Sequence, residues 1–405
     1  MLSRISSVAA IALVMTGTAA GVAEARDIKV LHAFRGGKDG GDPSSGLTSD
    51  TQGNLYGTTN TGGKGSCNGG GGCGTVFKIA IDTGKKTTLY TFKGKNDGSA
   101  PFGAVTVGSD GSVYGVASAS GAPCGCGTVF KIRPDGTEKT LYKFLGGTDG
   151  SKPLAGVTLD AGGNIYGTTQ QGGGSCGCGT VYKLTPDGSE TLLHSFTGGA
   201  DGADPWSGVA FDSAGNLYGT TQDGGTGCSF ECGTLFKIAT NGTKSVVHNF
   251  GVDIEDGGAP MGALVFDNTG TLWGTTPQGG DSVRGTLYKV APNGTESVVW
   301  AFGGFQDGAF PQDGVVFDGT GNLYGTLPTD GSEGPGMIFK WSIAGQSESI
   351  VYAFPGHPAG RGPSGLLAFD AGGHMYGTTY AGGGHNATGC DPNGCGEAFK
   401  LPPPK

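Results

Sequence analysis

The chain has 405 residues, a formal net charge of −9 and only 15% charged residues. Nucleic-acid-binding surfaces need clustered lysine and arginine, so this composition argues against a nucleic-acid partner. Glycine accounts for 86 residues and proline for 20, which would be typical of a low-complexity chain if these residues had no pattern. They do have one, because the glycines recur at fixed positions of an internal repeat.

The chain begins with the pattern of a secretory signal peptide. Arg4 precedes an uncharged run over residues 5–22, and Ala23-Glu24-Ala25 is a small-x-small cleavage pattern. We therefore predict a signal peptide over residues 1–25 and a secreted or periplasmic mature protein. An uncleaved membrane anchor is the alternative, although polar residues interrupt the apolar run. No later segment has the roughly 18 apolar residues of a transmembrane helix, so we expect no transmembrane segment in the mature chain.

The mature chain contains seven copies of one repeat. Its first element is Tyr-Gly-Thr-Thr or a near variant, beginning at Tyr56, Tyr114, Tyr166, Tyr218, Trp273, Tyr324 and Tyr376. The second is an aromatic residue followed by lysine, with these lysines: Lys78, Lys131, Lys183, Lys237, Lys289, Lys340 and Lys400. The third ends in phenylalanine, at Phe34, Phe92, Phe144, Phe196, Phe250, Phe302 and Phe354.

Each repeat has the pattern of four short antiparallel strands. In the third repeat we expect these strands at residues 156–160, 164–169, 179–184 and 190–196, which are rich in β-branched and aromatic residues. A glycine precedes the aromatic residue of the second strand by three positions in all seven copies, as a turn with positive φ requires. Asp-Gly or Asn-Gly joins the last two strands in four copies, and this dipeptide favours a hairpin.

Seven such units could stack as a solenoid or close as a propeller, and the chain ends favour the propeller. An unpaired fourth-type strand, Ile28 to Phe34, precedes the first full unit, and the last unit stops after its third strand at Leu401. In a closed ring the N-terminal strand completes the last blade and removes both exposed edges. We therefore predict an all-β fold: a seven-bladed β-propeller of four-stranded blades over residues 26–401, with a short proline-rich tail at residues 402–405.

The repeat also resembles a known family, the exported bacterial choice-of-anchor proteins with GloVer tandem repeats. The resemblance rests on Gly-Asn-Leu-Tyr-Gly-Thr-Thr at residues 53–59, Gly-Thr-Val-Phe-Lys at residues 74–78, and the matching segment at residues 215–221. It covers the whole mature chain. It implies an exported protein of the bacterial surface or envelope and brings no catalytic residues with it. Such proteins often end in an anchor, and this sequence shows none of the anchor patterns.

All ten cysteines lie in one kind of loop, the connection between the second and third strands, which also holds the length differences between repeats. They form five local pairs: Cys67 and Cys73, Cys124 and Cys126, Cys176 and Cys178, Cys228 and Cys232, Cys390 and Cys395. An even number of cysteines in an exported chain predicts disulfides, here one within each loop. For the two Cys-Gly-Cys pairs, bridges between neighbouring loops and a four-thiolate zinc site are the alternatives.

The connections between the fourth strand and the next first strand should share one face with the cysteine loops, because both leave the same end of an antiparallel sheet. Insertions on one face of a repeat protein often mark its binding face. Six of these connections carry Asp-Gly followed by a proline, with these aspartates: Asp39, Asp97, Asp149, Asp201, Asp256 and Asp307. The carboxylates could form an acidic ring that binds a cation. We favour a turn-forming role, because aspartate before glycine forms turns by itself.

The residue after the conserved proline position changes between repeats: Ser44, Phe102, Leu154, Trp206, Met261, Gln312 and Ser364. Phe102, Trp206 and Met261 are candidate ligand contacts, because variable apolar side chains in surface loops often bind ligands. The alternative, which we favour on the sequence alone, is that these side chains fill the space between adjacent blades.

Histidines supply a second set of candidates. Three of them occupy the fourth-strand position that holds tyrosine or tryptophan elsewhere, and we interpret them as packing residues: His32, His194 and His248. Four other residues break the repeat and all fall in the last unit, as an asymmetric functional cluster would: His357, Arg361, His374 and His385. We take His357 and Arg361 as further candidate ligand contacts.

These patterns lead to two main hypotheses for function. The first is a non-enzymatic, monomeric binding or surface-interaction propeller that uses the cysteine-loop face to bind an extracellular glycan or protein. The alternative is an extracytoplasmic hydrolase or lyase that acts on a sugar or lactone at the mouth of the central channel. The sequence contains no nucleophile-elbow, zinc-protease or phosphate-loop motif, which favours the binding protein. A purely structural envelope component is a third hypothesis, and the sequence identifies no cofactor.

Overall fold

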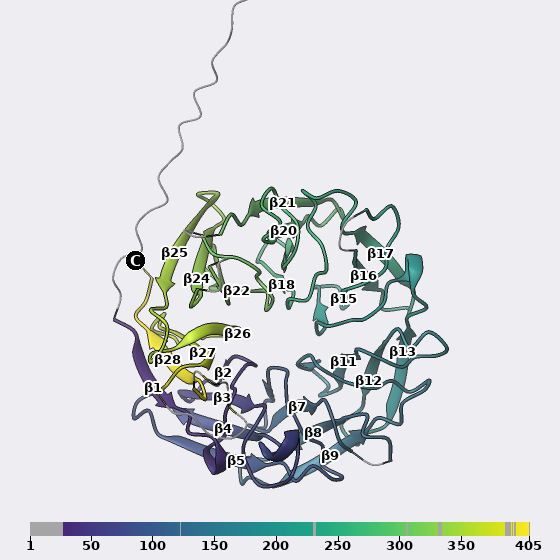
Figure 1. Cartoon of the computed structure of the whole chain (residues 1–405). Coiled ribbons are helices and arrows are strands. Elements are labelled where there is room, and N and C mark those ends of the chain that lie inside the picture. The colour runs from purple at the N-terminus through teal and green to yellow at the C-terminus, as the bar shows by residue number, and fades with distance from the viewer. Residues whose placement is uncertain are drawn as a thin grey trace, which may run out of the picture.

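The computed structural model describes residues 27–404 except 122, 230–231, 305–306, 331–333, 385–389, 391 and 393. The described residues form seven four-stranded antiparallel sheets in a ring, a seven-bladed β-propeller (Figure 1). This confirms the fold predicted from the repeat. The predicted signal peptide and His385 lie outside the described residues. The part of the chain that the structure describes contains no helix with the length and hydrophobicity of a membrane span.

The first strand of each blade lies nearest the axis and is short in most blades. These innermost strands are β2 (Thr48–Ser49), β6 (Thr106–Val107), β10 (Thr158–Leu159), β14 (Ala210–Phe211), β18 (Val265–Phe266), β22 (Val315–Phe317) and β26 (Arg361–Phe369). The second strands are β3 (Asn54–Thr59), β7 (Val113–Ala117), β11 (Ile165–Thr169), β15 (Leu217–Thr221), β19 (Leu272–Thr276), β23 (Asn322–Leu327) and β27 (Met375–Ala381).

The remaining strands lie toward the rim of the ring (Figure 1). The third strands are β4 (Thr75–Ala80), β8 (Thr128–Ile132), β12 (Thr180–Leu184), β16 (Thr234–Ile238), β20 (Thr286–Val290), β24 (Met337–Ser342) and β28 (Glu397–Leu401). The fourth strands are β5 (Lys86–Thr91), β9 (Glu138–Lys143), β13 (Glu190–Ser195), β17 (Lys244–Asn249), β21 (Glu296–Ala301), β25 (Ser347–Ala353) and, for the last blade, β1 (Lys29–Ala33). Three short 3₁₀ turns lie in loops: η1 (Gly37–Asp39), η2 (Asn68–Gly70) and η3 (Gly199–Asp201).

The N-terminal strand closes the ring, as the sequence predicts. β1 pairs antiparallel with β28, with Lys29 opposite Lys400 and Ala33 opposite Glu397. In Figure 1 the purple start of the chain therefore lies beside its yellow end. Each blade has the order first, second, third, fourth strand from the axis outward, and the last blade takes its fourth strand from the beginning of the chain.

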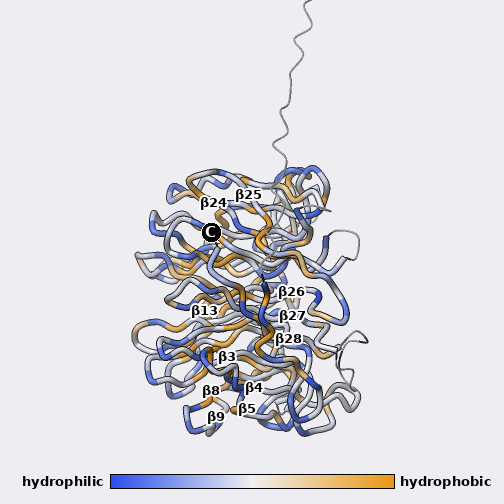
Figure 2. The backbone as a smooth tube through the Cα atoms, turned by 90° about the vertical axis from the view of Figure 1, so that its left-hand side faces the viewer, coloured by the Kyte–Doolittle hydropathy of each residue, from blue (hydrophilic) through white to orange (hydrophobic). Residues whose placement is uncertain are grey.

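The hydrophobic core consists of seven clusters, each shared by adjacent blades. At every blade interface the phenylalanine that follows a fourth strand packs edge-on against the third-strand aromatic residue of the next blade, with ring centroids 4.9–5.3 Å apart. Such pairs contribute roughly 0.5–1.5 kcal/mol each beyond the burial of their surface. In Figure 2 hydrophobic segments follow the strands and hydrophilic segments gather at the loops. The phenylalanine element and the aromatic-lysine element of the repeat therefore contact each other between adjacent blades.

The glycine of the Tyr-Gly-Thr-Thr element makes room for these rings. A Cβ atom added to Gly57 would lie 2.7 Å from the Cζ atom of Phe77, inside van der Waals contact. Any side chain at this position would therefore push the aromatic ring out of the interface. The glycine of the tetrapeptide is therefore a packing residue of the blade.

Candidate functional site

The cysteine loops are held by local disulfides, as predicted. The structure pairs Cys67 with Cys73, Cys124 with Cys126, Cys176 with Cys178, Cys228 with Cys232, and Cys390 with Cys395. None of the described cysteines is free. Bridges between neighbouring loops and a four-thiolate zinc site are therefore not what the structure contains, because each sulfur is used within its own loop.

The cysteine loops and the fourth-to-first strand connections share one face of the disc. Backbone bridges join the two kinds of loop within six blades, for example between Ser151 and Gln171 and between Ala203 and Asp223. This shared face, which we call the cysteine face, was expected from the antiparallel order of the strands. It places five disulfide loops around one mouth of the central channel.

Each cysteine loop also positions the next blade. The residue before the proline of each blade donates its backbone N–H to a carbonyl oxygen of the preceding blade. The acceptor is the residue just before the glycine that leads into the third strand. Asp204, for example, donates to the carbonyl oxygen of Cys178 at 2.9 Å. The donor residue has positive φ in all seven blades, between 51° and 61°, and six of the seven donors are not glycine: Asp42, Ala100, Lys152, Asp204, Ala259 and Phe310. Because positive φ is costly for such residues, the hydrogen bond and its surroundings must hold the kink.

A close contact between glycine and proline completes this junction. A Cβ atom added to Gly179 would lie 2.4 Å from Cδ of Pro205. In all seven junctions a Cβ atom added to the corresponding glycine would lie 2.4–2.7 Å from the proline of the following blade. The last of these contacts, between Gly396 and Pro43, joins the two ends of the chain. The kink and the proline together direct the next residue toward the axis.

The seven variable residues that follow the prolines line one cavity at the channel mouth. A narrower part of about 100 Å³ lies between the starts of the innermost strands, and a wider part of about 250 Å³ opens toward the loops. Phe102, Trp206 and Met261 line both parts. The sequence favoured a place between adjacent blades for these side chains, whereas the structure places them in the lining of this cavity. Their role as ligand contacts stays a prediction.

The same cavity contains residues that the sequence analysis missed. Tyr380, at the end of the second strand of the last blade, lines the wider part together with Asp42 and Pro328. Asp313 lines both parts, and Thr326 donates a hydrogen bond to its carboxylate at 3.2 Å. Burial in the channel wall raises the pKa of Asp313 to about 6. Both side chains could have been found as breaks in the repeat, since Asp313 takes a position that is serine, glycine or alanine in the other blades.

The candidate cluster in the last blade does not assemble. His357 is exposed on the connection between β25 and β26, and Arg361 begins β26 without lining the cavity. His374 lies in the turn between β26 and β27, at the opposite end of the sheet, where its Nδ1 atom is 3.0 Å from Asp370. His385 lies outside the described residues. A ligand contact by His357 or Arg361 stays a prediction without a shared pocket to support it.

A larger hollow of about 860 Å³ lies on the face opposite the cysteine face. It is lined by turn residues of the first, second and last blades, including Asp50 and Asp370. Their carboxylates accept hydrogen bonds from their own turns, Asp50 from Asn54 and Asp370 from His374. Because its polar groups serve these turns, we assign the functional site to the smaller cavity with convergent variable residues.

The six aspartates of the fourth-to-first strand connections form turns, which supports the structural interpretation. Each accepts a hydrogen bond from the backbone N–H four residues earlier, at 2.6–3.3 Å. Five of them also bond the tyrosine or histidine of the preceding fourth strand, as Asp149 does with Tyr142 at 2.6 Å. They are thus tied to the outermost strands and do not form an acidic ring around the channel.

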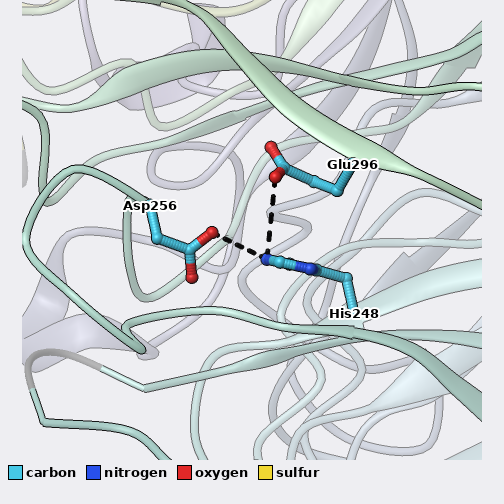
Figure 3. A group of neighbouring side chains, drawn as sticks. All are labelled: His248, Asp256 and Glu296. Carbon is cyan, nitrogen blue, oxygen red and sulfur yellow. Dashed lines mark hydrogen bonds and ion pairs between the residues drawn. The ribbon is translucent and has the colours of Figure 1, made fainter.

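One of these aspartates belongs to a second candidate site on the rim. His248 of β17, Asp256 of the following connection and Glu296 of β21 bring three ligand atoms within 4.8 Å of one another (Figure 3). Nε2 of His248 is 2.8 Å from Asp256 and 3.9 Å from Glu296. Burial would lower the pKa of His248, but the hydrogen bond and charge of Asp256 raise it overall. Burial also raises the pKa of Glu296 to about 7. The sequence analysis missed Glu296, because it lies 48 positions from His248.

These features define a class: a disulfide-bearing seven-bladed β-propeller with a cavity at one mouth of its channel. The chain belongs to the Gloeobacter/Verrucomicrobia repeat family, which matches residues 15–177 and 158–390. This confirms the resemblance read from the repeat motifs. None of the curated proteins matches the chain.

Solved structures of similar shape have distant sequences. An oligogalacturonate lyase from Vibrio parahaemolyticus is 10% identical with a TM-score of 0.58, and the match covers 94% of each chain. A fungal alcohol oxidase in complex with copper is 12% identical with a TM-score of 0.58, covering 94% of this chain and 77% of that one. A puromycin hydrolase is 12% identical with a TM-score of 0.55, covering 87% of this chain and 50% of that one. At these identities the similarity shows the fold alone.

Proposed function

We propose that this protein is an exported, monomeric binding propeller that takes one sugar unit of a glycan into the cavity on the cysteine face. The observation that carries the proposal is the convergence of seven variable side chains, one from each blade, on one cavity. In a repeat protein whose scaffold positions are nearly invariant, variable residues that converge on one lining are typical of a binding site.

The chemistry of the lining suits a sugar ring. Phe102, Trp206 and Tyr380 offer aromatic faces on which the C–H face of a sugar can stack. Gln312 and Asp313 offer an amide and a carboxylate that can bind hydroxyl groups. A wider part of about 250 Å³ is slightly below the range of about 300–1,000 Å³ typical of small-molecule sites, so it suits one ring rather than a folded partner.

The disulfides support a place outside the cytoplasm. Five disulfides in one chain are expected where the environment is oxidising. The disulfides close the loops that surround the proposed site. The backbone carbonyl group of the second cysteine in each loop accepts the hydrogen bond of the junction to the next blade. Export allows these disulfides to form, and the disulfides in turn constrain the loops around the site.

A glycan array with the purified protein tests the proposal. We expect binding to a limited set of glycans, lost or weakened at least about tenfold in Trp206→Ala and Phe102→Ala. Leu145→Ala is the matched control, because Leu145 is an exposed apolar residue away from the cavity. Unchanged binding in both cavity variants, or no binding to any glycan, would refute the proposal. Sedimentation of the same sample tests the monomer.

The second candidate function is a hydrolase or lyase acting on a sugar or lactone at this mouth. Asp313 favours it, because a carboxyl group with a pKa of about 6 in a cavity can act as an acid or a base near neutral pH. Incubation with the bound glycans and with sugar lactones, followed by product detection, distinguishes the two. Turnover that Asp313→Asn abolishes while binding persists would establish the enzyme.

A further inference from the structure

Three of the blade interfaces carry a histidine and aspartate pair at the rim. In each pair the histidine comes from a fourth strand and the aspartate from the connection that follows: His32 with Asp39, His194 with Asp201, and His248 with Asp256. In all three, Nε2 faces the carboxylate at 2.8–3.0 Å and the ring packs edge-on against the next phenylalanine of the strand. The three pairs therefore share the same side-chain contacts, although His248 and Asp256 are eight positions apart and the other two pairs seven.

A third residue beside each pair differs between the interfaces. It is contributed by the fourth strand of the next blade, at the same position of the repeat. In two interfaces it is lysine, and its ammonium group contacts the aspartate: Lys86 with Asp39 at 2.8 Å and Lys244 with Asp201 at 2.6 Å. In these interfaces the histidine and aspartate pair thus already holds a cation, which the chain itself supplies.

At the remaining histidine interface the third residue is Glu296, so a carboxylate stands where the other two have a cation. Its side chain is only 10% exposed, and Oε2 is 3.9 Å from Nε2 of His248. Oε1 is buried and has no hydrogen-bond partner among the described residues. Figure 3 shows both carboxylates directed at the ring nitrogen. A buried acceptor without a partner is costly, and at this interface two carboxylates face a single imidazole.

We propose that His248, Asp256 and Glu296 bind one zinc ion. Imidazole and carboxylate donors are common zinc ligands, and three protein ligands leave a fourth position for water. A divalent ion would balance both carboxylates, as one lysine balances one carboxylate in the other interfaces. The histidine nitrogen disfavours calcium and magnesium, which prefer oxygen donors alone.

Only small movements would form the site. Zinc at roughly 2.0–2.1 Å from tetrahedral ligands keeps the ligand atoms about 3.3 Å apart. The pair His248 and Asp256 would open from 2.8 Å, and Glu296 would approach from 3.9 Å. Both changes are within reach of side-chain rotation. The side chains of His248 and Asp256 are 22% and 12% exposed, so an ion can enter from solvent.

Titration of the tag-free, metal-free protein with Zn²⁺ against a chromophoric chelator tests the proposal. We expect one equivalent for the wild type and none for Glu296→Lys, which copies the residue of the two sister interfaces. Lys244→Glu should create a second site of the same composition and raise the stoichiometry to two. Lys86→Glu repeats this test at a different interface if one variant folds poorly. Glu296→Gln should weaken binding about 10–100-fold.

Cobalt substitution identifies the ligands. A visible spectrum of tetrahedral Co²⁺ with nitrogen and oxygen donors is expected, and thiol counting on the same samples excludes thiolate ligands. Circular dichroism confirms that each variant keeps its strands. Equal zinc stoichiometry in the wild type and Glu296→Lys would overturn the proposal, as would a wild type that binds no zinc. A Lys244→Glu protein that folds and still binds one equivalent would overturn the role assigned to the third residue.

Discussion

The junction between blades predicts a large difference between two glycines that lie two positions apart. Gly177 and Gly179 both have positive φ, at 68° and 95°, so alanine at either position adds backbone strain of about 1 kcal/mol. A Cβ atom at Gly177 would meet nothing within 4 Å, whereas one at Gly179 would lie 2.4 Å from Pro205 and 2.5 Å from the carbonyl oxygen of Thr169. Overpacking of this kind costs about 2 kcal/mol more. We therefore expect Gly177→Ala to lower the free energy of unfolding by about 1 kcal/mol and Gly179→Ala by about 3 kcal/mol.

Urea unfolding under oxidising conditions, followed by circular dichroism, measures both values. Because Pro205 precedes Trp206, Gly179→Ala should also shift the tryptophan fluorescence of the folded protein and weaken ligand binding, while Gly177→Ala leaves both unchanged. Equal costs for the two variants would refute the assignment of Gly179 to the junction. A costly Gly179→Ala with normal ligand binding would instead refute the link between the junction and the cavity.

Three further predictions concern stability. Burial and the charge of Asp307 raise the pKa of Glu348 to about 8, above its ordinary value of 4.5. The folded protein should therefore lose stability as the pH rises from 4.5 to 8, because the buried carboxyl group becomes charged. Glu348→Gln should therefore raise the free energy of unfolding by about 1–2 kcal/mol at pH 8.5 and change it little at pH 4. Urea titrations at both pH values measure this difference, and an equal effect at both would count against the pKa shift. Asp149→Ala should lower stability by about 2 kcal/mol, since it leaves the Tyr142 hydroxyl and the Leu145 N–H without their acceptor, whereas Tyr142→Phe should cost only about 1 kcal/mol in the same assay; a reversed order would contradict this role. Reduction of all five disulfides should lower the melting temperature yet leave the ring folded at 25 °C, because two blades keep the same strands without cysteines; loss of the β-sheet spectrum on reduction would contradict that expectation.

Much of the fold could be predicted because its determinants are local and repeated. The turn glycines, the strand motifs and the Asp-Gly hairpins each depend on residues a few positions apart. A strand assignment that is ambiguous in one repeat is resolved by comparison with the other six. The closing strand, Lys29–Ala33, was predictable because the last blade has no fourth strand of its own. Only the strand limits differed, since the innermost strands are mostly shorter than their sequence patterns.

The candidate site was only partly predictable. Phe102, Trp206 and Met261 stood out by their variation and line the cavity, yet the sequence favoured a place between blades. Nothing local indicates that a carbonyl from one blade fixes positive φ in the next, and that contact decides where these side chains point. Asp313 was overlooked although the other blades have small residues at its position. The sequence alone does not show that this position lines the channel.

The sequence by itself therefore determined the blade, the number of blades, the closing strand and the disulfide loops, since each depends on spacing along the chain. The tertiary structure alone decided which side chains meet. Seven residues spread over the whole chain converge on one cavity, and Glu296 reaches His248 from the neighbouring blade. The physical reason is that a propeller forms its functional surfaces between blades and around the axis, where contacts join residues about one repeat apart or more.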